Sequence, residues 1–96
     1  MDEVLVADPR VLGRFVEDGR IVQMPAKRSR RLVVLDWVVQ RFEPGRRYSE
    51  LEVHALLRPA FADVAALRRY LVDERFLDRA DGAYWRCGGS VTIESS

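Results

Sequence analysis

The chain has 96 residues, of which 48% are hydrophobic and 32% are charged, and this balance excludes an intrinsically disordered protein. No apolar run approaches the roughly 20 residues of a membrane-spanning helix, and the acidic start Met1-Asp2-Glu3 lacks the basic flank of a signal peptide. The single cysteine, Cys87, excludes an internal disulfide and fits a reducing compartment, so the sequence predicts a cytoplasmic protein.

The net charge of +1 is distributed unevenly along the chain. Residues 1–18 hold five acids and two bases, residues 19–60 hold four acids and nine bases, and residues 61–96 hold six acids and five bases. A basic middle of this kind suits phosphate, but the preference for arginine is equally expected from a GC-rich genome. Charge alone therefore leaves nucleic-acid binding open.

The first predicted helix begins at Asp8-Pro9, because a carboxylate caps a helix and proline is tolerated at its first position. Its apolar positions repeat at helical spacing, and Asp18-Gly19 is expected to end it. Residues 20–24 have the composition of a strand, which Pro25 closes. An N-terminal helix followed by a strand is therefore expected.

Three further helices are predicted in the middle of the chain. Residues 32–42 carry an apolar stripe so wide that the helix must be buried on more than one side, and residues 43–45 stop it. Ser49 and Glu52 have the spacing of a capping box, in which each side chain bonds the other's free backbone N–H. Asp63 is expected to cap the last helix.

A hairpin is predicted at Asp81-Gly82, because this dipeptide readily adopts the positive φ angles of a type I′ turn. Its strands are residues 76–79 and 83–86, and the strand at 20–24 is the expected third partner, since an isolated hairpin is marginal in water. The order of elements predicts an α+β winged helix-turn-helix with an N-terminal helix and a small antiparallel sheet. We expect one domain over residues 1–96, with its core at about 8–87 and a tail or an edge strand (Val91–Ile93) at 88–96.

Short motifs covering roughly residues 14 to 86 match one bacterial family: Glu17-Asp18-Gly19-Arg20, Met24-Pro25, Arg41-Phe42-Glu43-Pro44-Gly45, Tyr48-Ser49-Glu50-Leu51-Glu52-Val53, Asp63, Leu67-Arg68-Arg69, Leu77-Asp78-Arg79 and Tyr84-Trp85-Arg86. On these motifs the chain resembles the family catalogued as domain of unknown function 2087. It departs from the family at His54, where the pattern usually has asparagine. The resemblance implies a winged-helix-like domain associated with bacterial transcriptional regulators. Such a domain would bind DNA, sense an effector, form a dimer or dock to another protein.

Eight residues are the predicted nucleic-acid contacts: Arg28, Arg30, Arg46, Arg47, Ser49, Arg69, Arg79 and Arg86. Ser49 starts a helix, where backbone N–H groups and the helix dipole favour a phosphate. Arg69 is expected on the outward side of the last helix, where arginine can reach a guanine edge or a phosphate. The predicted wing carries Arg79 and Arg86. Arg46 and Arg47 directly precede the helix that Ser49 starts, and Arg28 and Arg30 open the core helix.

Each of these contacts has a structural alternative. Arg46 and Arg47 could lie in a solvated turn, and the basic run at residues 27–31 could lay its aliphatic stems on apolar surface. Arg79 could stack on Tyr84, the residue opposite it in the hairpin. For Arg68, at the edge of the core, we expect a salt bridge to Asp36 or Asp63.

Catalysis and metal binding find little support. His54 and Cys87 are single, widely spaced potential metal ligands, and the sequence has no Gly-rich phosphate loop and no nucleophile with a base beside it. We therefore expect no enzyme, no cofactor and no metal.

Two functions remain as hypotheses. The first is a DNA-binding, transcription-associated regulatory module, acting as a monomer or a homodimer. The second is a protein-interaction or dimerisation module without DNA contact, whose interface would use the N-terminal helix and the apolar residues Val34, Trp37 and Val72.

Overall fold

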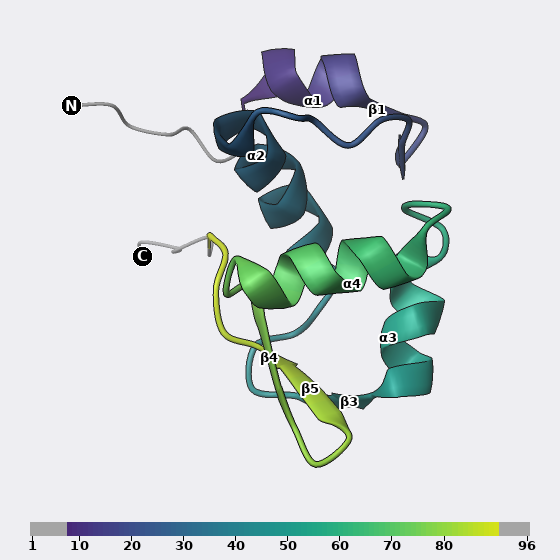
Figure 1. Cartoon of the computed structure of the whole chain (residues 1–96), viewed down its shortest axis with the longest axis vertical. Helices are drawn as coiled ribbons and strands as arrows, with labels where there is room; N and C mark the ends of the chain where they lie inside the picture. Colours follow the sequence, from purple (N-terminus) through teal and green to yellow (C-terminus); the bar gives the residue numbers. More distant parts are fainter. Residues whose placement is uncertain (1–7, 91–96) are drawn as a thin grey trace, which may run out of the picture.

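The computed structural model describes residues 8–90, which form four helices and two small antiparallel sheets, an α+β arrangement (Figure 1). The elements in chain order are α1 (Pro9–Phe15), β1 (Val16–Glu17), β2 (Arg20–Ile21), α2 (Arg28–Val39), β3 (Arg47–Ser49), α3 (Glu50–Leu57), α4 (Val64–Asp73), β4 (Leu77–Ala80) and β5 (Ala83–Arg86). Figure 1 shows α1 at one end of the molecule and the β4–β5 hairpin projecting from the other, with α4 between them.

The N-terminal helix begins as predicted but is shorter. The Asp8 side chain accepts a hydrogen bond from the Arg10 N–H, and Pro9 is the first helical residue. The helix ends at Phe15, because the next residues form a short hairpin. Its strands β1 and β2 have two residues each, and Asp18-Gly19 is the turn between them. Both turn residues have positive φ, 51° and 75°, as a type I′ turn requires. The expectation that Asp18-Gly19 ends the helix is wrong, because these residues connect strands.

The core is built around α2. Its residues Val34, Leu35, Val38 and Val39 are fully buried, which confirms the prediction of a helix covered on several sides. Partners in this cluster come from α1, α3, α4 and the larger sheet. Burial of Val34 corrects its assignment to an exposed interface: it faces the core and is not available to a partner.

Helices α3 and α4 begin at the predicted caps. In α3 the Ser49 Oγ accepts from the Glu52 N–H at 3.1 Å, and the Ser49 N–H donates to the Glu52 carboxylate at 2.8 Å, which completes the capping box. In α4 the Asp63 carboxylate accepts from the Ala66 N–H at 3.0 Å. A cap of this kind contributes about 1 kcal/mol to stability. Both helix starts are therefore fixed by local sequence.

The larger sheet has the strand order β3-β5-β4, with Tyr48 opposite Tyr84 and Tyr84 opposite Arg79. The third partner of the hairpin is thus β3, and the prediction that residues 20–24 take this place is wrong. Only Arg20–Ile21 form a strand, and they pair with β1 instead. Strand β3 is held by Tyr48, which is buried and whose hydroxyl accepts the Glu43 N–H at 2.8 Å.

Residues 88–90 return to the core and pack against α2. The Ser90 N–H and Oγ donate to the two carboxylate oxygens of Asp36, at 2.6 and 2.7 Å, and Asp36 is 2% exposed. The Ser90 carbonyl accepts from Arg86 at 2.6 Å and from Gln40 at 2.8 Å. This segment is therefore tied to the core. The edge strand expected at Val91–Ile93 lies outside the described residues.

Candidate nucleic-acid interface

One face of α4 is turned away from the core. Val64, Leu67 and Leu71 are buried, so Arg69 and the small residue Ala65, one helical turn before it, lie on the exposed side. This confirms the predicted orientation of α4. It leaves an arginine and a small side chain free to meet a partner.

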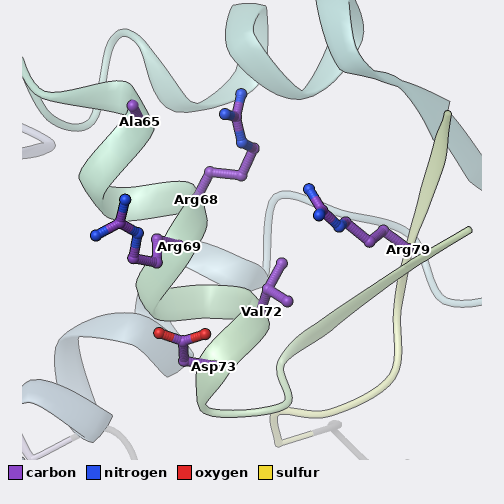
Figure 2. A pocket seen from close by; sticks show the side chains of 6 residues that line it. All are labelled: Ala65, Arg68, Arg69, Val72, Asp73 and Arg79. Atoms are coloured by element: carbon purple, nitrogen blue, oxygen red, sulfur yellow. The ribbon is translucent and has the colours of Figure 1, made fainter.

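A hollow of about 330 Å³ lies between this face of α4 and the β4–β5 hairpin. Its lining residues are Ala65, Arg68, Arg69, Val72, Asp73 and Arg79 (Figure 2). In Figure 2, Arg68 and Arg79 point into the space between helix and hairpin, while Arg69 extends from the side of α4 that is turned away from the hairpin. We call this hollow the α4–wing groove, after the wing that the sequence predicts for this hairpin. It brings three guanidinium groups together with one carboxylate, that of Asp73.

The three arginines of the groove differ in how they are held. Arg68 Nη1 lies 3.5 Å from a carboxylate oxygen of Glu50, and this pairing replaces the expected salt bridge to Asp36 or Asp63. Arg79 Nη1 lies 3.5 Å from the Tyr84 hydroxyl, a long contact consistent with the predicted cross-strand packing.

Arg69 is exposed and has no hydrogen bond or ion pair to any other residue within 8–90. Exposed guanidinium groups held by such weak contacts can be reorganised by an anionic ligand. Arg69 and Arg79 are exposed in this way, and Arg68, whose side chain is 26% exposed, pairs with an exposed acid.

The start of α3 offers less to a phosphate than the sequence suggested. The Glu52 carboxylate already accepts the Ser49 N–H, and Arg46 lies 3.4 Å from the same carboxylate. The hydrogen bond from the Ser49 backbone is the largest cause that lowers the pKa of Glu52, with the nearby Arg46 charge adding to it. A negative charge of the chain itself therefore occupies the place where a phosphate would approach this helix.

Arg46 and Arg47 lie on two aromatic rings. The Arg46 guanidinium is 4.6 Å from the centre of the Tyr48 ring, and that of Arg47 is 4.6 Å from the centre of the Trp85 ring. Neither residue lines the α4–wing groove. These stacks give both arginines a structural role, and each remains exposed.

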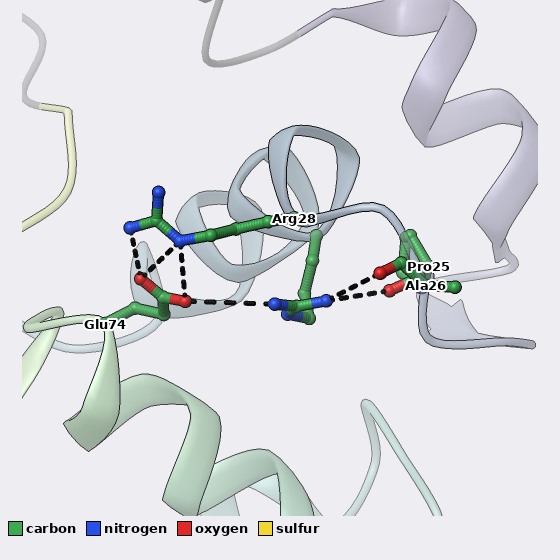
Figure 3. A network of polar contacts seen from close by, with 5 residues as sticks. Pro25, Ala26, Arg28 and Glu74 are labelled. Atoms are coloured by element: carbon green, nitrogen blue, oxygen red, sulfur yellow. Dashed lines mark hydrogen bonds and ion pairs between the residues drawn. The ribbon is translucent and has the colours of Figure 1, made fainter.

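The arginines at the start of α2 separate to two sides of the helix. Arg28 donates to both carboxylate oxygens of Glu74 at the end of α4, with a shortest distance of 2.7 Å, and Arg31 lies 3.9 Å from the same carboxylate (Figure 3). Arg31 also donates to the backbone carbonyls of Pro25 and Ala26. Arg28 and Arg31 therefore connect the start of α2 to the end of α4 through Glu74.

Arg30 does not take part in these ion pairs with Glu74. It lines a separate hollow of about 300 Å³ together with five residues from the start of the described chain: Asp8, Arg10, Val11, Arg14 and Phe15. The structure thus does not bring Arg28 or Arg30 into the α4–wing groove.

Arg86, the second arginine predicted on the wing, is used inside the fold. Its guanidinium donates to the backbone carbonyls of Phe42 at 3.1 Å, Gly88 at 3.0 Å and Ser90 at 2.6 Å. The side chain connects the end of β5 to Phe42, three residues after the end of α2, and to the segment that contacts Asp36. Gly88 and Ser90 lie two and four residues after Arg86, whereas Phe42 is 44 residues away, and no local pattern could have indicated this distant contact.

The potential metal ligands stay apart. Within residues 8–90 no three side chains of His, Cys, Asp or Glu are close enough to hold a metal ion. Cys87 is exposed, and its thiol donates to the Arg75 carbonyl at 3.2 Å. Desolvation, followed by the charge of Asp78, raises the pKa of the Cys87 thiol. A raised pKa lowers its reactivity as a nucleophile.

The family of the chain follows from comparison with known proteins. Residues 20–86 match the family described as "Uncharacterized protein conserved in bacteria (DUF2087)". This match spans more than half of the 96 residues, and the chain therefore belongs to this family. The comparison with curated proteins and that with solved structures each found no significant match. In the described part of the chain, no helix has the length and apolar character needed to span a membrane.

Proposed function

We propose that this protein is a winged helix-turn-helix module that binds DNA through the α4–wing groove and takes part in transcription regulation. The observation that carries the proposal is the groove itself, which three arginines line: Arg68 and Arg79 point into the space between α4 and the β4–β5 hairpin, and Arg69 extends from the outer side of α4 (Figure 2). Arginine is the side chain best suited to bind phosphates and guanine edges in a bidentate manner.

The arrangement of elements supports this proposal. From α2 onward the order is helix, strand, helix, helix, strand, strand, and the strand before α3 pairs with the second strand of the hairpin. In a winged helix-turn-helix, the helix in the position of α4 enters the major groove, and the hairpin contacts the DNA beside it. The proposal therefore assigns recognition to α4 and the wing to β4–β5.

Within this proposal the residues have different roles. Arg69 is the candidate for contact with base edges, because it is exposed on α4 and has no ion-pair partner in the described chain. Arg79 is the candidate for a phosphate contact from the wing. Ala65 permits close approach of α4 to the DNA. Arg46 and Arg47, which stack on aromatic rings, lie outside the proposed DNA-binding surface. Arg86 is assigned no DNA contact, because its guanidinium already donates hydrogen bonds to three carbonyls.

The rival proposal, a protein-docking module, draws on the exposed apolar residues. Leu51 is 81% exposed on α3 and Val22 is 52% exposed. Single exposed apolar side chains are common on monomeric proteins and do not by themselves mark an interface. Trp37 is half-buried, with the Arg41 guanidinium 4.7 Å from its ring centre, so it too offers little apolar surface. The α4–wing groove is therefore a more specific indication of function than these exposed apolar side chains.

The test is fluorescence anisotropy with a labelled DNA duplex of mixed sequence, titrated at low and at physiological salt. We expect binding at low salt, and we expect Arg69→Ala and Arg79→Ala each to weaken it by about five- to tenfold, as for loss of one charged contact. Arg20→Ala is the matched control, because it removes the same charge from an exposed residue that lines neither the groove nor the hollow at α1.

The outcomes separate the two proposals. A circular dichroism spectrum and a melting temperature close to those of the wild type must accompany each variant. Equal weakening by all three substitutions would show that only net charge matters and would contradict the assignment to the groove. No binding by the folded wild type at low salt would favour the docking module.

A further inference from the structure

One ion pair joins α3 to a residue that lines the α4–wing groove. Arg68 on α4 lies 3.5 Å from the carboxylate of Glu50 in the first turn of α3, and no other ion pair in residues 8–90 joins these two helices. The Arg68 side chain is 26% exposed and that of Glu50 is 68% exposed. Arg68 therefore lines the groove while its charge is partly satisfied by an acid that solvent and ligands can reach.

Glu50 is also close to the wing. It lines a second hollow, of about 270 Å³, whose other lining residues belong to the hairpin: Arg79, Ala80, Asp81, Gly82 and Tyr84. Arg79 lines both this hollow and the groove. One carboxylate is thus adjacent to two of the three arginines that define the proposed DNA-binding surface.

Other interactions do not account for Glu50. The capping box of α3 uses Glu52, whose carboxylate accepts the Ser49 N–H. As an acid in the first turn of α3, Glu50 interacts favourably with the helix dipole, but Glu52 also lies in that turn. The specific contact of Glu50 is the one with Arg68.

We infer that Glu50 acts as an internal competitor for phosphate in the α4–wing groove: it holds Arg68 in the free protein, and a DNA phosphate displaces it. The inference rests on the proposed function. An exposed ion pair is weak, so a ligand that offers Arg68 another anion can replace Glu50 without unfolding the site. Until then, the pair reduces the positive charge that the groove presents.

An internal competitor of this kind lowers the affinity of the protein for DNA. Removing the Glu50 charge frees Arg68 for contact with a phosphate. We expect Glu50→Gln to strengthen binding to a mixed-sequence duplex by about two- to fivefold at low salt, the range for one exposed charge pair. Because a phosphate contacts Arg68 in the wild-type complex as well, the slope of log K against log salt should change by less than about 0.9, the value for one added contact.

The experiment is a double-mutant cycle read by fluorescence anisotropy, with the labelled duplex as the probe. The variants are Glu50→Gln, Arg68→Gln and the double variant. Glu17→Gln is the control, because it removes the same charge from an exposed residue of β1 that lines neither hollow. The inference requires a gain with Glu50→Gln, little or no gain with Glu17→Gln, and no gain from Glu50→Gln in the Arg68→Gln background.

Three results would overturn the inference. Equal gains from Glu50→Gln and Glu17→Gln would mean that the effect is one of net charge. A gain that persists in full with Arg68→Gln would exclude the route through Arg68. Absence of binding by the wild type and by Glu50→Gln, both folded, would overturn the proposed function as well, whereas wild-type binding that is unchanged in Glu50→Gln would overturn the inference alone.

Discussion

At the scale of single residues, two glycines show how differently the same residue type is used. Gly89 has a φ of +95°, and a Cβ added to it would lie 2.6 Å from Val39 Cγ1 and 3.1 Å from Asp36 Oδ1. Gly13 lies inside α1, and a Cβ added there would meet nothing within 4 Å. The first glycine is required by the packing of the segment against α2, and the second is not.

We therefore predict opposite effects for two Gly→Ala substitutions. Gly89→Ala should lower the free energy of unfolding by about 1–3 kcal/mol, because it adds backbone strain and crowds the Asp36 contacts. Gly13→Ala should raise it by about 0.5–1 kcal/mol, because alanine is the better helix former. Urea denaturation measures both. A neutral Gly89→Ala would mean that the segment at 88–90 does not depend on this close contact.

Residue-level prediction from sequence was strongest where the interaction is local. The caps at Asp8, Ser49 and Asp63 were predicted correctly, because each bonds an N–H two or three residues away. It failed for Arg68, whose partner Glu50 lies eighteen residues away, and nothing in the sequence distinguishes Glu50 from the other acids. Asp36 posed the same difficulty, because its partner Ser90 is 54 residues away.

At the scale of elements, one acid supplies the ion pairs between the start of α2 and the end of α4. Glu74 at the end of α4 accepts hydrogen bonds from Arg28 and lies 3.9 Å from Arg31. The hydrogen bond from Arg28 is the largest cause that lowers the pKa of Glu74, and the charges of Arg28 and Arg31 add to it. The ionised acid therefore stabilises the folded state more than the unfolded one.

This predicts a pH dependence of stability. Because the pKa of Glu74 is lowered on folding, its contribution is fully present above the unfolded value of about 4.3 and is lost as the pH falls through the folded value. The melting temperature of the wild type should exceed that of Glu74→Gln near neutral pH, and this difference should shrink below about pH 4. Arg28 is well exposed, so the difference should also shrink in high salt.

Melting curves over this pH range provide the measurement. Glu17→Gln is the control, because the Glu17 side chain is exposed and makes no hydrogen bond or ion pair within residues 8–90. A difference between wild type and Glu74→Gln that stays constant down to the lowest pH would argue against the lowered pKa and against a role for the ion pair.

The element prediction that failed concerned turns rather than helices. Asp18-Gly19 and Asp81-Gly82 both form tight hairpin turns with positive φ. The second was predicted because strand-like residues flank it, whereas the first follows a helical apolar pattern and was interpreted as a helix stop. Asp-Gly is compatible with both structures, and tertiary contacts decide between them.

At the scale of the whole molecule, the ambiguous turn at Asp18-Gly19 also led to the wrong sheet for the strand predicted at residues 20–24. Once Arg20–Ile21 pair with β1, and the Ile21 N–H donates to the Ala60 carbonyl, they cannot also join the β4–β5 hairpin. The three residues of β3 take that place, although they are too few to show a strand pattern. Sequence thus predicted the helices and the hairpin of an α+β fold but not the pairing of its sheet, which is set by contacts distant in the chain.

The overall charge distribution gives the last prediction, which rests on the proposed function. The net charge is only +1, and the groove holds three arginines and one aspartate, so few phosphates can be neutralised by one molecule. Two to three contacts give a slope of log K against log salt of about −2 to −3 for one bound protein, and two bound copies would give about twice this value.

Anisotropy titrations at several salt concentrations, combined with the mass of the complex from analytical ultracentrifugation, separate these cases. A slope steeper than about −6 with one protein bound would require more than six phosphate contacts. The groove could not supply them, so the arginines on other surfaces, such as Arg30 with Arg10 and Arg14 beside α1, would have to participate. A slope within the expected range that becomes shallower by about 0.9 in Arg79→Ala would assign one of the contacts to the wing.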